Sequence, residues 1–206
     1  MRSAAFWCLF TAPLFGGTIS LTGNLSPDDP NDVLLAAFTL SSTANVSFQS
    51  WGYGGTANAP GGTNAAGAVI TPGGFDPYLS LFAGAGPSAT FLVSNDDGFC
   101  PPGTPGPACR DSSLDVLNLA AGTYTAALSV FSNFSFAENF GSGTLGDGFI
   151  GLGSYYNADS DSFRNPAYAL DITSDGLPVA IPEPGTLGVL AAATLLFIIG
   201  RRRRIR

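Results

Sequence analysis

The side chains with the clearest capacity for chemistry are oxygen donors placed at turns. Asp76 precedes an apolar run, an Asn-Asp-Asp-Gly turn follows another run, and Asp111 comes shortly after. Carboxylate and amide oxygens are the hard ligands that calcium takes, six to eight per ion. Because turns can meet at one edge of a sheet, the candidate calcium ligands are Asp76, Asn95, Asp96, Asp97 and Asp111. The alternative is that Asn-Asp-Asp-Gly is turn chemistry with no ligand.

Missing residue types exclude most catalytic devices. The chain has no histidine and no lysine. It therefore cannot form a Ser-His-Asp triad, a Cys-His catalytic pair or a Schiff base through lysine. A pair of acids flanking a glycosidic bond remains open, and a buried, close pair in a cleft would favour it. We expect no enzymatic activity and no cofactor, with calcium as the one exception.

Aromatic side chains offer a second kind of binding chemistry. A flat apolar ring beside polar groups can stack on a sugar, and Trp51, Tyr53, Tyr155 and Tyr156 are the candidates. The sequence also contains sixteen phenylalanines, which favours the alternative that most aromatic area fills a core.

The distribution of charge excludes one class of partner. Between residues 24 and 180 there are two arginines against fourteen acidic residues. Nucleic acids need basic partners for their phosphates, so we expect no nucleic-acid binding. An acidic body of this kind is soluble and attracts cations.

Two cysteines bracket a proline- and glycine-rich loop. Cys100 and Cys109 are separated by eight residues, a spacing that predicts a disulfide in an oxidising compartment. The alternative is two free thiols in a flexible loop. A zinc site is not expected, because two thiols have no imidazole to join them.

The elements that must position these groups are short strands. Alternating apolar residues, punctuated by glycine, proline, asparagine and aspartate about every ten residues, favour an all-β fold, an antiparallel β-sandwich or jelly roll. Helices of any length are expected only at the two ends of the chain. The predicted strands cover residues 33–40, 46–51, 78–82, 90–94, 113–119, 123–131, 148–152 and 168–172.

The N-terminus has the layout of a signal peptide. Arg2 is followed by an apolar stretch and then by small residues, which predicts a signal helix within residues 1–20. The alternative is a buried first strand. The extracytoplasmic β domain then covers residues 21–178.

The last segment, residues 179–206, has three consecutive parts. A Pro-Glu-Pro triplet precedes an apolar stretch over 185–200, and an arginine cluster follows. The sixteen apolar residues reach about 24 Å as a helix, against a hydrocarbon core of about 30 Å. Snorkelling arginines allow such a short helix to span, and they predict a cytoplasmic C-terminus with the body outside. The residues of the candidate signal are Pro182, Glu183, Pro184, Arg201, Arg202, Arg203 and Arg204.

This tail resembles the PEP-CTERM sorting signal of Gram-negative bacteria that make exopolysaccharide. The resemblance implies recognition by an exosortase, a membrane-embedded cysteine transpeptidase that cuts near the triplet. It further implies transit through the inner membrane, followed by release to the cell surface or extracellular matrix. We therefore expect a non-catalytic surface or matrix protein associated with exopolysaccharide or biofilm. The alternatives are a secreted carbohydrate- or calcium-binding module, and a single-pass membrane protein that is never cut.

The body carries a second resemblance, in four short phrases. Residues 75–82 read FDPYLSLF, 94–98 read SNDDG, 111–114 read DSSL and 121–124 read AGTY. In this order they resemble the pre-peptidase C-terminal type of β-sandwich, a secreted accessory module. The chain departs from that pattern by the loop between the two cysteines, directly after the SNDDG phrase, and by a longer Gly-Ala-rich stretch over residues 52–67.

Overall fold

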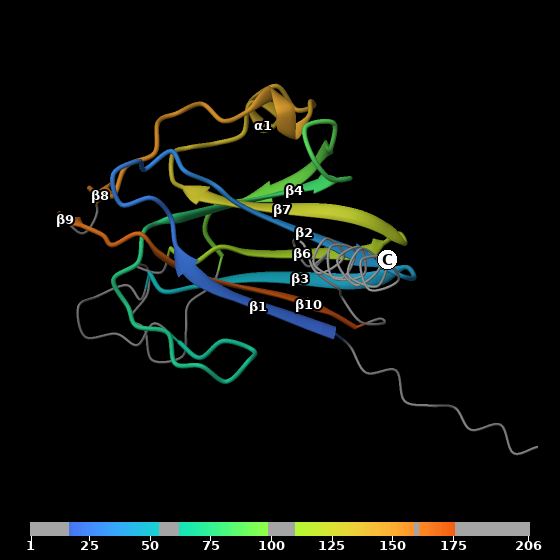
Figure 1. Cartoon of the computed structure of the whole chain (residues 1–206), viewed down its shortest axis with the longest axis horizontal. Coiled ribbons are helices and arrows are strands. Elements are labelled where there is room, and N and C mark those ends of the chain that lie inside the picture. Colours follow the sequence, from blue (N-terminus) through green and yellow to red (C-terminus); the bar gives the residue numbers. More distant parts are fainter. Residues whose placement is uncertain (1–16, 54–61, 99–109, 159–160, 176–206) are drawn as a thin grey trace, which may run out of the picture.

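The computed structural model describes residues 17–53, 62–98, 110–158 and 161–175. These residues form two four-stranded antiparallel sheets, of order β1-β10-β3-β6 and β2-β7-β4-β5, and a small β8-β9 hairpin (Figure 1). The expected all-β, antiparallel architecture is confirmed. The elements are β1 (Gly17–Asn24), β2 (Leu34–Leu40), β3 (Ala44–Trp51), β4 (Pro77–Ala83), β5 (Thr90–Asn95), β6 (Ser113–Leu119), β7 (Gly122–Val130), α1 (Phe136–Asn139), the 3-10 turn η1 (Leu145–Asp147), β8 (Tyr156–Asn157), β9 (Ser162–Phe163) and β10 (Ala167–Ser174).

The two large sheets pack against each other through one apolar core. Along β3, Val46 and Phe48 are buried while Asn45 and Ser47 face solvent, as the two-residue period of a strand requires. Phe48 meets Phe38 of the other sheet, with ring centroids 5.7 Å apart. Side chains from both sheets therefore interdigitate in a sandwich, and buried residues of nearly every long strand contribute to it.

The outer face of the second sheet is covered as well. Phe82 of β4 and Ala127 of β7 form a second apolar cluster with Ala137 and Leu145. The latter two belong to α1 and η1, and α1 lies above β4 and β7 in Figure 1. This cover explains why all residues of β4 from Pro77 to Phe82 are buried, instead of every second one.

Most predicted strands occur, with ends shifted by one or two residues, but the strand predicted over 148–152 is wrong. That segment contributes a single bridge, between Phe149 and Ser135. Gly148 and Gly151 have φ angles of 82° and 74°, a left-handed conformation that breaks an extended run on either side of the bridge.

The two predicted terminal helices lie almost wholly outside the described residues. The transmembrane segment 185–200 is not among them, and of the signal segment 1–20 only residues 17–20 are. Those four residues form the first half of β1, which pairs with β10 from Gly17 to Asn24. No helix in the described ranges is long and apolar enough to cross a bilayer.

Candidate metal centre

Three strand ends meet at one end of the sandwich. β4 and β5 are antiparallel neighbours in which Leu79 pairs with Asn95, so the residues after β5 lie beside the residues before β4. The start of β6 joins them, because the Ser112 hydroxyl donates to the carbonyl oxygen of Pro77 at 2.6 Å and also contacts that of Asp96. This convergence brings sequence positions about 20 and 35 residues apart into one cluster.

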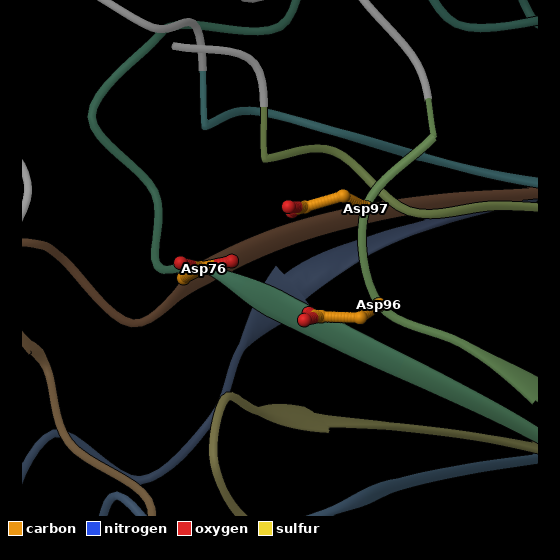
Figure 2. Close-up of side chains that lie close together, drawn as sticks. All are labelled: Asp76, Asp96 and Asp97. Atoms are coloured by element: carbon orange, nitrogen blue, oxygen red, sulfur yellow. The ribbon is translucent and has the colours of Figure 1, made fainter. Parts of the chain in front are cut away.

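Asp76, Asp96 and Asp97 form that cluster. One carboxylate oxygen from each residue lies within 4.8 Å of the other two, and Figure 2 shows the three side chains converging from the start of β4 and the end of β5. Two oxygens bound to the same calcium ion at about 2.4 Å can be at most about 4.8 Å apart. The spacing therefore allows all three carboxylates to bind one cation.

Two oxygens of the cluster have no hydrogen-bond partner among the described residues. Asp76 is 7% exposed, and its Oδ2 accepts from the Asn157 side-chain amide at 3.0 Å. Its Oδ1 and the Oδ1 of Asp96 are buried and receive no donor. Buried carboxylate oxygens almost always have a partner, so such atoms indicate a missing ligand or a proton.

Burial and mutual repulsion change the acidity of the cluster. Desolvation, followed by the charges of Asp96 and Asp97, raises the pKa of Asp76 to about 7, although Arg110 and Arg164 oppose the change. Desolvation and the charge of Asp97 raise the pKa of Asp96 to about 6. Without a cation, the cluster therefore holds protons near neutral pH that isolated carboxylates would have lost.

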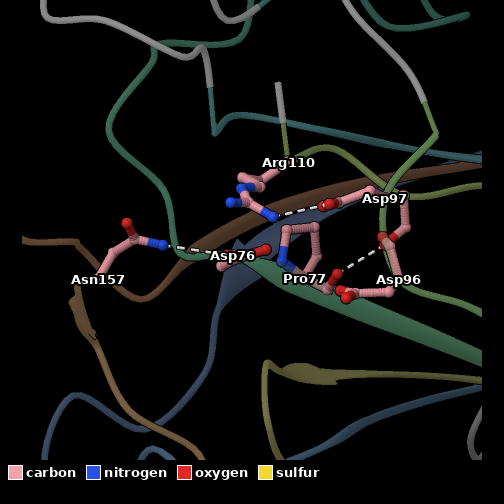
Figure 3. Close-up of polar contacts among 7 residues, drawn as sticks. Asp76, Pro77, Asp96, Asp97, Arg110 and Asn157 are labelled. Carbon is pink, nitrogen blue, oxygen red and sulfur yellow. Dashed lines mark hydrogen bonds and ion pairs between the residues drawn. The ribbon is translucent and has the colours of Figure 1, made fainter. Parts of the chain in front are cut away.

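Arg110 and Asn157 frame the cluster, and sequence reasoning missed both as site residues (Figure 3). Arg110 Nη1 donates to Asp97 Oδ2 at 2.7 Å in a partly exposed ion pair. The sequence could have pointed to Arg110, because it is one of only two basic residues in a strongly acidic body. Asn157 comes from the β8-β9 hairpin, about 80 residues beyond Asp76, and no local pattern marks it.

The other two predicted ligands have different surroundings. Asp111 is buried, and its Oδ1 accepts from the backbone N–H of Tyr53 at 3.3 Å and from Ser50 Oγ at 3.4 Å. It thus ties the start of β6 to the end of β3 and is not one of the three clustered carboxylates. Asn95 ends β5, and its Oδ1 is a further buried oxygen without a hydrogen-bond partner.

A cleft of about 250 Å³ adjoins the cluster. Asp76, Arg110 and Asn157 supply its polar wall, and Phe131, Leu152 and Tyr156 supply its apolar wall. Neither Asp96 nor Asp97 lines it. A glycosidase needs two carboxyl groups flanking the bond in the cleft, and among the described lining residues Asp76 is the one acid.

The aromatic candidates separate into covered and exposed rings. Tyr53 is buried beneath the Arg164 guanidinium, which lies 3.9 Å from the ring centroid. Trp51 donates its indole N–H to Asp171 at 2.8 Å, and Tyr155 donates its hydroxyl to the carbonyl of Ser26 at 2.7 Å. Of the four predicted rings, Tyr156 is the one on an exposed residue, at 43% exposed.

The predicted disulfide and sorting signal fall outside the described residues. Cys100 and Cys109 both lie in the segment 99–109, and residues 176–206 contain the Pro-Glu-Pro triplet and the arginine cluster.

Comparison with known protein families finds a match at the C-terminus. The PEP-CTERM protein-sorting motif matches residues 180–204, which include Pro182, Glu183, Pro184 and the four consecutive arginines. No curated protein matches the chain, and the resemblance of the body to the pre-peptidase C-terminal module stays a prediction. The chain carries a PEP-CTERM protein-sorting motif at residues 180–204.

Proposed function

We propose that this chain is an exported protein that an exosortase cleaves near Pro182–Pro184 and passes to the cell surface or extracellular matrix. The single observation that supports it is the sorting motif at residues 180–204. The arginines at its end favour retention of the tail in the cytoplasm, so the triplet lies outside the inner membrane during transit. The prolines remove backbone donors and disfavour helix, which presents an extended strip to a processing enzyme.

We propose further that the body acts without catalysis, in association with exopolysaccharide or biofilm. The absence of histidine and lysine supports this, as does the cleft with one acid among its described lining residues.

Intact-mass measurement tests the sorting proposal. The protein is recovered from producing cells with and without the exosortase, and its mass is compared with that of the full chain. We expect the C-terminal arginines to be lost only when the exosortase is present. A triple alanine variant of Pro182, Glu183 and Pro184 should retain them, whereas the body variant Phe140→Ala should be cut normally. Mature wild-type protein that keeps its final arginines would refute processing and leave a tethered protein.

The cleft favours a second candidate function, binding of a saccharide. Tyr156 offers an exposed ring, braced by an edge contact to Phe163 with centroids 5.3 Å apart. Asp76, Arg110 and Asn157 offer charged and amide groups across the same cleft. Sugar sites combine an apolar platform with a few directed polar groups in this way.

Retention on the producer's own exopolysaccharide tests this second function. We expect Tyr156→Ala to abolish specific retention. Phe140→Ala removes a ring on the residue that caps the C-terminus of α1 and is 77% exposed. Phe140 is not among the residues that line the cleft, so retention should be unchanged. Equal retention of both variants would reject the cleft as a saccharide site.

A further inference from the structure

We propose that Asp76, Asp96 and Asp97 bind one calcium ion, which joins the start of β4 to the end of β5. Neither sorting nor saccharide binding requires such an ion. The proposal rests on two independent observations. The three carboxylate oxygens lie within 4.8 Å of one another, and two buried oxygens of the same cluster lack a hydrogen-bond donor within the part of the chain that the structure describes.

The unpartnered oxygens are the stronger observation, since an acidic cluster alone is common on protein surfaces. Asp76 is more than nine-tenths buried, and its Asn157 contact uses Oδ2 and leaves Oδ1 directed at its two neighbours (Figure 2). Arg110 neutralises part of the charge through Asp97, but it gives no hydrogen bond to Asp76 Oδ1 or Asp96 Oδ1. A cation among the three oxygens would satisfy both atoms and offset the repulsion together.

The donor set selects calcium among biological metals. All the ligands are hard oxygens, and the chain contains no histidine, so zinc and copper lack the nitrogen ligands that they prefer. Magnesium demands near-ideal octahedral geometry and dehydrates reluctantly, whereas calcium accepts irregular shells of six to eight ligands. Asp97 is 42% exposed at its side chain, so waters can complete the shell from the solvent side.

The ion would connect the β8-β9 hairpin to the strand ends at β4 and β5, which the apolar core alone does not join. Asp76 Oδ2 binds Asn157 of the β8-β9 hairpin, while Ser112, before β6, holds the backbone of Pro77 and Asp96. Fixing the Asp76 carboxylate therefore orders one wall of the adjoining cleft as well as the two strand ends. Extracellular calcium modules typically bind with Kd values of about 10⁻⁴ to 10⁻³ M, and we expect the same range here.

Calcium titration of the full chain, purified in a mild detergent, tests the site. Tm is followed by tryptophan fluorescence in EDTA, in 5 mM calcium and in 5 mM magnesium, and the calcium Kd is measured calorimetrically. We expect calcium to raise Tm by about 5 °C, and magnesium by much less. Because sorting is not part of this readout, failure here would leave the proposed processing intact.

Matched variants locate the ion. Asp96→Asn preserves the size of a ligand and removes its charge, and we expect a calcium Kd at least tenfold weaker. Asp97→Asn changes a more exposed ligand and provides a second test if Asp96→Asn does not fold. Asp115→Asn is the control, because Asp115 is exposed on β6 and bonds Ser47 outside the cluster. No calcium-dependent rise in Tm, an equal rise in magnesium, or equal loss of affinity in the control variant would overturn the proposal.

Discussion

We expect the substitution Asp76→Asn to stabilise the metal-free protein at pH 8, even though it removes a proposed calcium ligand. Asparagine has nearly the same size and can still accept the hydrogen bond that Asn157 donates to Asp76 Oδ2. Its amide NH₂ would stand where Oδ1 now faces Asp96 and Asp97, and would donate to their carboxylates. The substitution thus replaces a buried repulsion with an attraction.

The size of the effect follows from the pKa of Asp76. Burial raises this pKa from 3.8 to about 7, and each pKa unit corresponds to about 1.4 kcal/mol of free energy. Ionised Asp76 therefore destabilises the folded state by up to about 4 kcal/mol. Local relaxation and water entering at the exposed Asp97 reduce this cost, so we expect a gain of about 2 kcal/mol. In a body of this size that corresponds to a rise in Tm of about 4–8 °C.

The pH dependence distinguishes this cause from better packing. Between about pH 4 and pH 7 the folded protein holds a proton at Asp76 that the unfolded chain has lost, so wild-type stability falls as the pH rises through this window. The loss is complete above about pH 7. Asp76→Asn has no such group, so its advantage over the wild type should be small at pH 4 and reach its maximum at pH 8.

Thermal unfolding of both full-length proteins in EDTA, in steps from pH 4 to pH 8, measures this difference. Subtracting the two curves cancels the titration of the carboxylates that do not interact with Asp76, whereas Asp96 and Asp97 are coupled to it. Adding 5 mM calcium at pH 8 should raise the wild-type Tm and leave that of Asp76→Asn almost unchanged. If the variant melts at or below the wild type throughout, the buried carboxylate of Asp76 is not a source of instability, and our reasoning about the cluster fails.

Three further predictions concern the rest of the body. Asp171→Ala removes the acceptor that Asp171 gives to the Trp51 indole N–H and the Ala65 backbone N–H, both partly buried. At about 1 kcal/mol for each donor, Tm should fall by about 5 °C, while Asp115→Ala should change it by less than about 2 °C. Phe48→Ala empties a fully buried site between the sheets and should cost about 3–5 kcal/mol in chemical denaturation. Cys100 and Cys109 of the exported protein should resist alkylation until a reductant is added, and labelling without reductant would reject the predicted disulfide.

Strand positions could be predicted where a strand is buried on one face only, because apolar and polar residues then alternate in its sequence. The residues of β3 alternate in the sequence as they do in the fold. β4 does not follow this rule, because α1 and η1 cover its outer face with Ala137 and Leu145. That cover depends on the path of a later segment of the chain, which contains α1 and η1. The alternation of residues within β4 therefore does not reveal that its outer face is covered.

Part of the candidate site could also be predicted, because strand pairing brings Asp76 close to Asp96 and Asp97. Asp96 and Asp97 directly follow a strand whose hairpin partner begins next to Asp76, so the spacing of the turns was enough to bring these three together. Asp111 shared the same local pattern, but successive residues of an extended chain point to opposite sides. Ser112 faces the Pro77 carbonyl and Asp111 faces the Tyr53 amide. The choice between these directions depends on the register of β6 against β3, which the sequence does not specify.

The proposed export and the proposed cation binding reinforce each other. Cytosolic calcium sensors work at Kd values of about 10⁻⁷ to 10⁻⁵ M, so a site with a Kd near 10⁻⁴ M stays empty before export. In that state burial of the Asp76 carboxylate, followed by the charges of Asp96 and Asp97, raises its pKa and opposes folding while the group is ionised, and a chain that must cross a membrane benefits from delayed folding. Outside, calcium removes the repulsion and joins the strand ends. The acidic cluster would then make the stability of the body depend on the compartment to which the tail directs it.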